Sequence, residues 1–350
     1  MTRPLRLLIA QHRWWYPTAV SGADLANHEF AAGLVERGVE VLVHGIMPPG
    51  DSKRVQSRRY ISGGVQIRLF KSDFLKHLKH CIESFDPDVV LTTCPEPNCG
   101  TDDITRMVEA VRHARIPVAL YVHDLESTLP LFKEARDQLA AVVTNSRFMS
   151  RRIEQIWERD CDVVYPIPDR RPFFSDNTNG PFITFFNPLP HKGLGIAHML
   201  VMRRFPDRPF LFVEGFIDPE QHGIYLSRSG NLVHARRSPD VATIYSMSHV
   251  VIVPSQWEEP FGRVALEAML SNVPVIASRT GGLPESVGDG GILIDDYSNA
   301  DCWVDAINSL QDPRERRKWI TAGRRHVRSF SLDKQIDKLK RILEGISKQV

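Results

Sequence analysis

Short apolar runs alternate with helix-like segments along most of the chain, and this alternation restricts the fold more than any other feature. Each run is long enough for a buried strand, and most are followed by a segment whose apolar residues recur with a helical period. Such alternation predicts an α/β fold built on parallel, doubly wound sheets. The expected strands are residues 5–10, 39–43, 65–70, 89–92, 118–122, 141–144, 163–165, 182–186, 210–213, 232–234, 249–254, 273–277 and 292–294.

A turn-rich region divides this alternation into two series. Proline, asparagine, aspartate and glycine are concentrated in residues 166–172 and 176–181, and strands and helices resume after them. A chain of 350 residues is long for one ordinary domain and suits two of moderate size. We therefore predict one domain at residues 1–168 and a second at 169–330, followed by a final segment at 331–350.

The final segment, residues 331–350, has the period of an amphipathic helix. Ser331 and Asp333 suit its N-terminus. Its apolar residues fall on one face, which needs an apolar surface to cover, and the first domain is the candidate. The residues of this face are Leu332, Ile336, Leu339, Ile342, Leu343 and Ile346.

Composition excludes several classes of protein. The 44 basic and 42 acidic residues nearly balance, so the charge offers no argument for a nucleic-acid partner. No stretch approaches the roughly 20 apolar residues that span a bilayer. Basic residues at 71, 76 and 79 alternate with apolar ones, which leaves contact with an anionic membrane surface open beside the simpler interpretation of a solvated face. Nothing in the sequence sets the oligomeric state.

Cysteine and aspartate spacing gives no metal site. The five cysteines are odd in number and scattered, which is typical of reduced thiols in a cytoplasmic protein. Asp86 and Asp88 have the spacing of a metal-binding pair, as do Asp160 and Asp162, but both pairs lead into expected strands. We predict no catalytic metal and no cofactor.

The strongest candidate site is the stretch 257–269, which follows an apolar run and enters a helix-like pattern. It holds Glu259 and Glu267 with seven residues between them, about 12 Å along a helix at roughly 1.5 Å per residue. The carboxyl groups of a retaining glycosidase lie only ~5–5.5 Å apart. We therefore interpret the glutamates as hydrogen-bond acceptors for two diols, against the alternative of a solvated helix face. The turn 260–262 at a helix start would expose backbone N–H groups to an anion.

Two further residues lie where a strand leads into a helix. Lys192 follows the expected strand 182–186, and a cation beside a helix N-terminus suits a diphosphate; the alternative is an ordinary surface lysine. Gly22 opens the first helix, where a glycine lets phosphate oxygens approach the backbone, or else only forms a turn. No G-x-G-x-x-G occurs, which disfavours a nicotinamide dinucleotide site.

Polar and aromatic residues end two strands of the first domain. His123 and Asp124 follow the strand 118–122, at the edge of the sheet where ligands bind. The histidine could bond a sugar hydroxyl or a leaving oxygen, or it could be structural. Trp14, Trp15 and Tyr16 follow the first strand and could stack on an acceptor, although packing under the loop explains large aromatics better.

Three segments of the second domain together resemble a known family. Glu259-Pro260-Phe261-Gly262-Arg263 with Glu267, then 274–278, then 281–285, are similar to the family 4 retaining glycosyltransferases of the GT-B fold. The resemblance is specific over roughly 241–295 and looser over most of the remaining chain. It implies two Rossmann-like doubly wound domains, a donor nucleotide held mainly by the second, and a C-terminal helix that crosses back to the first.

The resemblance also implies roles for individual residues. Glu267 matches the glutamate that binds the ribose hydroxyls, and Glu259 the one near the transferred sugar. Lys192 matches the diphosphate lysine. The other residues expected at the donor or the sugar are Gly22, His123, Phe261, Gly262, Arg263 and Val264.

One position departs from the family. Family members commonly have an arginine five residues before the diphosphate lysine, where this chain has Asn187. A second positive group for the diphosphate must then come from elsewhere, with Arg263 as a candidate. The glycine pair of the first domain is also reduced to Ser21-Gly22.

The resemblance implies a metal-independent, retaining transfer of a hexosyl group from a nucleotide diphosphate sugar, with uridine favoured, to an unidentified acceptor hydroxyl. Two alternatives stay open. The chain could be an epimerase or phosphorylase of the same fold, acting on a sugar nucleotide or a glucan. It could also be a non-catalytic sugar-binding subunit, for which Asn187 is the one supporting feature.

Overall fold

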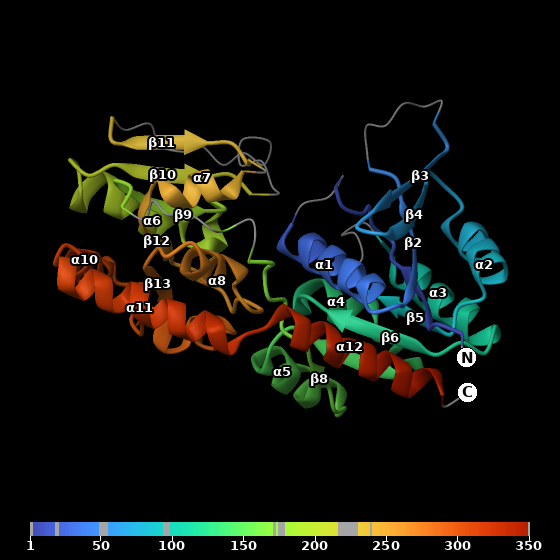
Figure 1. Cartoon of the computed structure of the whole chain (residues 1–350). Coiled ribbons are helices and arrows are strands. Elements are labelled where there is room, and N and C mark those ends of the chain that lie inside the picture. Colours follow the sequence, from blue (N-terminus) through green and yellow to red (C-terminus); the bar gives the residue numbers. More distant parts are fainter. Residues whose placement is uncertain are drawn as a thin grey trace. The chain divides into compact units, whose positions relative to one another are not determined.

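The chain forms two compact units in a computed structural model (Figure 1). One unit comprises Met1–Pro166 with Leu332–Val350, and the other comprises Ile167–Ser331. These bounds lie within two residues of the predicted domains. The structure describes residues 3–17, 21–48, 55–93, 99–170, 173, 179–215, 230–238 and 240–348.

The first unit is built on a twisted eight-stranded sheet in the order β3-β4-β2-β1-β5-β6-β7-β8. Every pairing is parallel except that of β3 with β4. The order reverses between β1 and β5, which places the crevice of the sheet at their carboxyl ends. The strands are β1 (Arg6–Ala10), β2 (Glu40–Ile46), β3 (Ser57–Ser62), β4 (Val65–Phe70), β5 (Val89–Thr92), β6 (Val118–Val122), β7 (Ala141–Thr144) and β8 (Asp162–Val163).

Helices cover both faces of this sheet (Figure 1). One core joins α1 and α12 to side chains such as Leu7 and Ile9, and the other joins α2, α3 and α5 to Leu8 and its neighbours. Alternate residues of the buried strand β1 thus point to opposite faces of the sheet and pack into the two cores. The helices are α1 (Gly22–Glu36), α2 (Phe74–Phe85), α3 (Thr101–His113), α4 (Leu125–Leu131), α5 (Arg147–Trp157) and α12 (Leu332–Ser347), with a 3₁₀ turn η1 at Arg136–Gln138.

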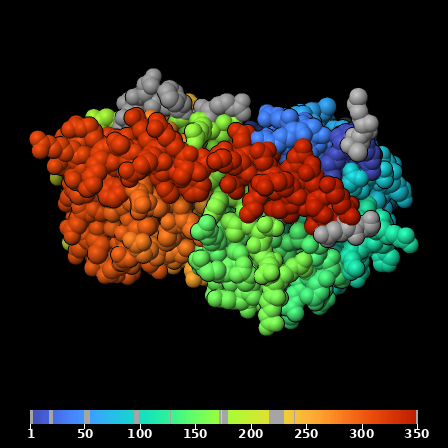
Figure 2. Space-filling model, turned by 60° about the horizontal axis from the view of Figure 1, so that its bottom comes forward, coloured from blue at the N-terminus to red at the C-terminus, as the bar shows by residue number. Residues whose placement is uncertain are grey.

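The C-terminal helix α12 belongs to the first unit, as predicted. Its buried residues Ile336, Leu339, Leu343 and Ile346 join the core beneath α1. Figure 2 shows this red segment lying against blue and green residues of the same unit. The amphipathic period therefore predicted both the helix and the surface that it covers.

The strand β3 was not predicted. It is the antiparallel edge of the sheet, and its residues Arg58 and Arg59 are exposed, as is Ile61 at 72%. An edge strand with one solvated face carries no continuous apolar run, so the search for buried runs missed it.

The apolar residues near the basic positions of α2 are core residues. Phe70, Phe74 and Leu78 are buried in the core that joins α2, α3 and α5 to the sheet, whereas Lys76 and Lys79 are exposed. The arrangement agrees with a solvated lysine face over a packed helix and offers no large apolar side chain from these buried positions to a membrane.

The second unit repeats the architecture with a six-stranded parallel sheet in the order β11-β10-β9-β12-β13-β14. Its order reverses between β9 and β12. The strands are β9 (Phe182–Phe186), β10 (Phe210–Val213), β11 (Leu232–Ala235), β12 (Ser248–Val253), β13 (Val275–Ser278) and β14 (Ile292–Ile294). The helical segments are η3 (Pro190–Lys192), α6 (Leu194–Met199), η4 (Leu200–Arg204), α7 (Val241–Ser246), α8 (Arg263–Leu270), α9 (Leu283–Val287), η6 (Gly288–Gly290), α10 (Ala300–Ser309) and α11 (Pro313–Ser329).

A buried histidine in the first unit makes stability depend on pH. His44 is fully buried, and Nε2 lies 3.0 Å from the carbonyl oxygen of Phe74. Burial, only partly opposed by this hydrogen bond, lowers the pKa of His44 from 6.5 to about 3. The unfolded chain therefore takes up the proton first as the pH falls. The stabilisation by neutral His44 is complete above pH 6.5 and is lost progressively towards pH 3.

We expect His44→Gln to flatten the pH dependence of unfolding. Within that window the free energy of unfolding of the wild type should fall up to about 1.4 kcal/mol per pH unit more steeply than that of the variant. Urea titrations at several pH values measure this difference. The exposed His80→Gln is the control and should keep the wild-type slope. Parallel curves for the wild type and His44→Gln would contradict the assignment.

Candidate functional site

The switch point of the second sheet brings Lys192 and Glu259 together. Lys192 follows β9 and Glu259 follows the neighbouring parallel strand β12, so both lie beyond strand carboxyl ends. Lys192 Nζ lies 2.6 Å from Glu259 Oε1, and the ammonium group also lies 4.6 Å from the centre of the Trp257 ring. The Ser255 hydroxyl donates to the same carboxylate oxygen at 2.7 Å. The predicted lysine and first glutamate thus form one charged centre.

The carboxyl group of Glu259 is held in its ionised form. Burial would raise its pKa, but the charge of Lys192 and hydrogen bonds from Lys192 and Ser255 outweigh burial and lower the pKa below its usual value. A buried carboxylate that stays charged is a hydrogen-bond acceptor and a poor proton donor. This electrostatic state suits recognition of hydroxyl groups better than general acid catalysis.

Two glycines let the turns of this crevice approach one another. Gly193 has φ +93°, and a Cβ there would lie 1.9 Å from the carbonyl oxygen of Pro254. Gly281 has φ +57°, and a Cβ there would lie 2.4 Å from the carbonyl oxygen of Glu259. Only glycine fits either position without displacing backbone. The turn after β13 therefore supports the turn that carries Glu259.

We expect Gly193→Ala to distort the site and to destabilise the protein by about 3 kcal/mol, because it combines backbone strain with a backbone clash. Gly195→Ala is the matched control two residues away. A Cβ at Gly195 would meet no atom of the described residues within 4 Å, and the residue lies inside α6, so this change should be neutral or stabilise by roughly 0.5–1 kcal/mol. Denaturant unfolding of both variants measures the difference. Equal stabilities would show that the close approach of the two turns does not matter.

Glu267 lies on α8, where two residues orient its carboxylate. The Tyr245 hydroxyl donates to Oε2 at 3.0 Å, and Arg263 Nε lies 3.5 Å from Oε1. Burial raises the pKa of Tyr245 well above its usual value, and the negative charge of Glu267 raises it further. The phenol therefore keeps its proton and remains a donor. Tyr245 is fully buried, which makes it a rigid support. Neither Tyr245 nor Ser255 was predicted from the sequence.

The remaining donor candidates frame the start of α8. Gly262 precedes the helix with φ +92°, and a Cβ there would lie 2.5 Å from the Leu283 side chain. Phe261 is 2% exposed, and Val264 lies half-buried in the first turn. The predicted turn and helix are thus present, with the helix N-terminus following the Glu259 turn.

The backbone conformation at position 187 offers a reason for the presence of asparagine there. Its φ is +57°, in the left-handed region that asparagine tolerates better than most residues. Its N–H donates to the carbonyl oxygen of Val213, and its side chain packs on Gly215, where a Cβ would lie 1.3 Å from Oδ1. Arg263, which we suggested as a substitute cation, lies beside Glu267, with 3.5 Å between Nε and Oε1.

A buried hydrogen-bond relay ends at His123 in the first unit. His123 Nε2 lies 2.7 Å from Asn27 Oδ1, and Asn27 Nδ2 donates to Thr93 Oγ1 at 3.3 Å. The Thr93 hydroxyl donates to Gln11 Oε1 at 2.8 Å, and Gln11 Nε2 donates to the Trp14 carbonyl oxygen at 2.9 Å. All four polar side chains are at most 7% exposed. The relay crosses the switch point, because Gln11 follows β1 and Thr93 follows β5.

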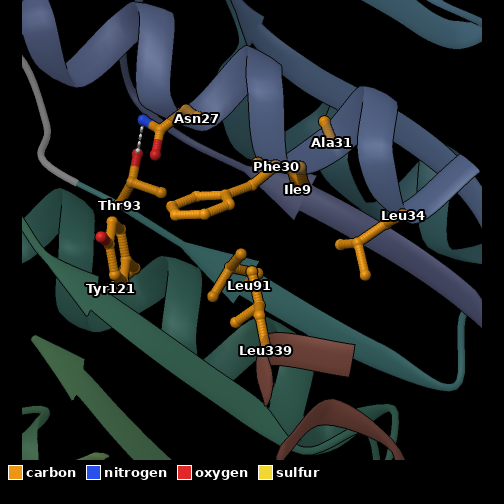
Figure 3. Close-up of a pocket in the computed structure, with 9 residues that line it drawn as sticks. All are labelled: Ile9, Asn27, Phe30, Ala31, Leu34, Leu91, Thr93, Tyr121 and Leu339. Atoms are coloured by element: carbon orange, nitrogen blue, oxygen red, sulfur yellow. Dashed lines mark hydrogen bonds between the residues drawn. The ribbon is translucent and has the colours of Figure 1, made fainter. Parts of the chain in front are cut away.

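Figure 3 shows Asn27 and Thr93 at one end of a small internal cavity. Apolar side chains such as Phe30, Leu91 and Leu339 form the rest of its wall. The volume is only about 10 Å³, about the space of one water molecule. This cavity is therefore a packing defect beneath the relay and too small for a substrate.

Sequence reasoning found His123 but not its supports. Asn27 is a polar residue among the buried positions of α1, and Gln11 directly follows a buried strand. A polar residue on an otherwise apolar helix face was the available signal, because buried polar groups need partners. Which partner it finds depends on the sheet order, which the sequence did not state.

The other candidates of the first unit lie around the start of α1. Gly22 is the first residue of this helix, which begins with a capping box: Ser21 accepts from the Asp24 N–H, and the Asp24 carboxylate accepts from the Ser21 N–H. The same carboxylate is paired with Arg13, with Nε to Oδ1 at 3.0 Å. The buried pair fixes the loop after β1 to the helix start.

The aromatic candidates differ in exposure. Trp15 is 1% exposed within the core, whereas Trp14 is half-buried. The Tyr16 ring stacks on His28 with 4.5 Å between ring centres. The core position of Trp15 agrees with the packing interpretation for that residue. Asp124 is half-buried beside His123 at the end of β6.

The described part of the chain contains one grouping of possible metal ligands. Atoms of His12, Cys99 and Asp103 lie within 4.8 Å of one another in the first unit. Asp103 is exposed and already accepts from the Gly100 N–H at the start of α3. None of the three is among the predicted site residues. In the described residues, no helix has the length and apolar character of a membrane span.

Solved structures share the two-unit fold. Anabaena HepE in complex with UDP and glucose is 17% identical, with a TM-score of 0.76 over 97% of this chain and 99% of that one. The sucrose-phosphate synthase of Thermosynechococcus elongatus is 18% identical, with a TM-score of 0.77 over 98% of this chain and 100% of that one. The chain therefore has the GT-B fold of glycosyltransferases.

Sequence comparison places a family domain in the second unit. Residues 228–326 match the family described as glycosyl transferases group 1. The D-inositol 3-phosphate glycosyltransferase of Corynebacterium diphtheriae is 34% identical over 161 residues, which are 42% of this chain and 37% of that protein. The spore coat protein SA of Bacillus subtilis is 40% identical over 81 residues, 23% of this chain and 22% of that protein.

The chain thus has the GT-B fold, and residues 228–326 of its second unit are similar to the group 1 glycosyl transferases. The match to the Corynebacterium diphtheriae relative spans little more than a third of that protein's length.

Proposed function

We propose that the protein is a retaining glycosyltransferase that moves a hexosyl group from a nucleotide diphosphate sugar to an acceptor hydroxyl without a metal ion. The observation that carries the proposal is the Lys192–Glu259 ion pair at the switch point, with Lys192 Nζ 2.6 Å from the carboxylate. A cation and a charged acceptor held at strand carboxyl ends can bind a diphosphate and a sugar hydroxyl side by side.

The donor would be held at three points in the second unit. Lys192 would meet the diphosphate, Glu259 a hydroxyl of the transferred sugar, and Glu267 the ribose hydroxyls. Tyr245 and Ser255 each donate to one of these carboxylates and keep it oriented before the donor arrives. We favour a uridine nucleotide, which the UDP complex of the similarly folded Anabaena HepE supports.

The transfer needs no protein nucleophile in this proposal. The bond between the anomeric carbon and the diphosphate oxygen breaks, and the acceptor oxygen attacks from the same face. Its proton passes to the departing phosphate oxygen. Lys192 and the N-terminus of α8 would stabilise the charge that develops on the diphosphate. The charged state of Glu259 is consistent with this route, because the route asks no carboxylic acid for a proton.

The experiment that tests the proposal supplies UDP-hexoses with and without candidate acceptors and identifies the products. We expect release of the nucleotide that depends on acceptor, and a product that keeps the anomeric configuration of the donor. Isomerised donor without acceptor would indicate an epimerase, and phosphate-dependent cleavage of a glucan would indicate a phosphorylase. Binding without turnover would support a non-catalytic subunit. A thermal-shift screen of nucleotide diphosphates identifies the donor base first.

Metal independence has its own measurement. Activity should survive dialysis against EDTA and should not rise when divalent cations are returned. Loss of activity on chelation, restored by a cation, would overturn this part of the proposal alone. We also propose a cytoplasmic location, since Cys81, Cys161 and Cys302 are free thiols among the residues that the structure describes.

A further inference from the structure

The relay that ends at His123 has only one consistent set of hydrogen-bond directions. The Trp14 carbonyl oxygen can only accept, so the Gln11 amide must turn its NH₂ group towards it. The Gln11 Oε1 atom then faces Thr93 and accepts from its hydroxyl. Because the Thr93 proton is used there, its oxygen accepts from the Asn27 NH₂ group. The carbonyl oxygen of Asn27 is left towards the His123 ring.

This order of donors determines the protonation of the histidine. An amide oxygen only accepts, so the His123 Nε2 atom at 2.7 Å must carry a proton. In the neutral ring the other nitrogen, Nδ1, then carries the lone pair and is an acceptor. A second bond, from Asn145 Nδ2 to the His123 backbone carbonyl at 2.8 Å, fixes the backbone of the same residue.

We infer that Gln11, Thr93 and Asn27 are positioning residues that hold His123 in the Nε2–H tautomer and tie its ring to the loop after β1. Three facts support this. The relay side chains are almost completely buried, so bulk water cannot easily replace a lost partner. The relay crosses the β1–β5 switch point, where the crevice of the first sheet lies. It also starts from a backbone carbonyl oxygen, which can only accept, so the donor and acceptor roles along the relay cannot be reversed.

The tautomer restricts which hydrogen bonds His123 can make to a substrate. This catalytic consequence rests on the proposed function. A histidine fixed as an acceptor at Nδ1 can accept a hydrogen bond from a substrate hydroxyl, but it cannot donate one from that atom while neutral. The relay also makes the ring orientation depend on the position of Trp14, one of the residues that we predicted on the acceptor side. A shift of that loop would therefore be felt at His123.

Nuclear magnetic resonance of protein labelled with ¹⁵N-histidine tests the tautomer without any substrate. Long-range proton–nitrogen spectra distinguish the two neutral tautomers, and the His123 signals are assigned by their loss in His123→Gln. We expect the Nε2–H form in the wild type. Asn27→Asp places a carboxylate at the same distance and should raise the pKa of His123 by about one to two pH units. An Nδ1–H ring, or an unchanged pKa in Asn27→Asp, would overturn the inference.

Thr93 offers a matched pair of substitutions for the rest of the relay. Thr93→Val removes the hydroxyl that accepts from Asn27 and donates to Gln11, so the Asn27 amide is no longer oriented. We expect a mixture of the two His123 tautomers in this variant. Thr92→Val is the control, because Thr92 is equally buried and its hydroxyl has no hydrogen-bond partner among the residues that the structure describes. Thr93→Ser keeps the hydroxyl and should restore the wild-type spectrum. Identical spectra for Thr93→Val and Thr92→Val would refute the relay.

Kinetics then test the catalytic consequence. Thr93→Val should lower kcat roughly tenfold or more, since small displacements of a positioned group reduce turnover. The affinity for the nucleotide should change little, because Lys192 and Glu267, which we propose to hold the diphosphate and the ribose, lie in the other unit. Thr92→Val and Thr93→Ser should keep wild-type kcat. If Thr93→Val showed the predicted tautomer change but wild-type kcat, the positioning role would be wrong. Absence of transfer by the wild type itself would contradict the proposed function and leave the spectra to decide the relay.

Discussion

Replacing Lys192 by methionine is expected to lower kcat by about 10²–10³, because the developing charge on the diphosphate loses its main cation. The same change leaves Glu259 buried without its counter-charge. We therefore expect the pKa of Glu259 to rise above its usual value and the free energy of unfolding to fall by roughly 3–5 kcal/mol. Turnover with saturating donor and denaturant unfolding measure the two effects separately.

A double variant separates the loss of chemistry from the loss of stability. Lys192→Met with Glu259→Gln removes both charges and keeps the shape of the site, so most of the stability should return. The activity should not return, because neither the cation nor the charged acceptor is present. Wild-type kcat in the double variant would refute the assignment of both residues. Recovery of neither stability nor activity would instead show that the pair has no energetic coupling.

Replacing Glu267 is expected to have the second large effect, on donor affinity. Glu267→Gln should weaken UDP binding about ten- to hundredfold, since a hydrogen bond to a charged group contributes roughly 1.5–3 kcal/mol. Glu267→Ala should reduce binding below detection by calorimetry. Tyr245→Phe removes only the hydroxyl group that donates to the Glu267 carboxylate at 3.0 Å, so this variant should lose less affinity for UDP.

A change in the ligand identifies which group Glu267 contacts. The wild type should bind 2′-deoxyuridine diphosphate more weakly than UDP, because one ribose hydroxyl is missing. In Glu267→Ala this preference should disappear, measured with a competing fluorescent nucleotide if calorimetry is too insensitive. A variant that still prefers the ribose form would show that Glu267 binds some other part of the donor.

The buried strands were predictable because their signal is local. A strand covered on both faces is a continuous apolar run, and β5, β6, β7, β9 and β10 have the predicted bounds. β4 also has its predicted bounds, although the exposed Gln66 and the half-buried Arg68 interrupt its apolar residues. The capping box at Ser21 and the glycine at position 38, with φ +78°, are equally local. The edge strand β3 was missed because only one of its faces is packed, so its charged residues break the run.

The candidate site was only partly predictable, for a related reason. Motif spacing identified Lys192, Glu259 and Glu267, and the resemblance assigned their expected roles. Their supports, Ser255 and Tyr245, come from turn and helix positions that carry no motif. The substitution at position 187 appeared as a missing charge in the sequence, whereas its left-handed backbone offers a conformational reason for asparagine.

The sequence by itself determined two series of strands and helices, an amphipathic last helix and the residues that carry charge in the second unit. These follow from periodicity and spacing, which act between residues close in the chain. Only the tertiary structure decided that Lys192 contacts Glu259, 67 positions away, and that Gln11 reaches Thr93 across the switch point. The reason is that strand order brings distant loops together, and short-range pattern does not specify which loops become neighbours.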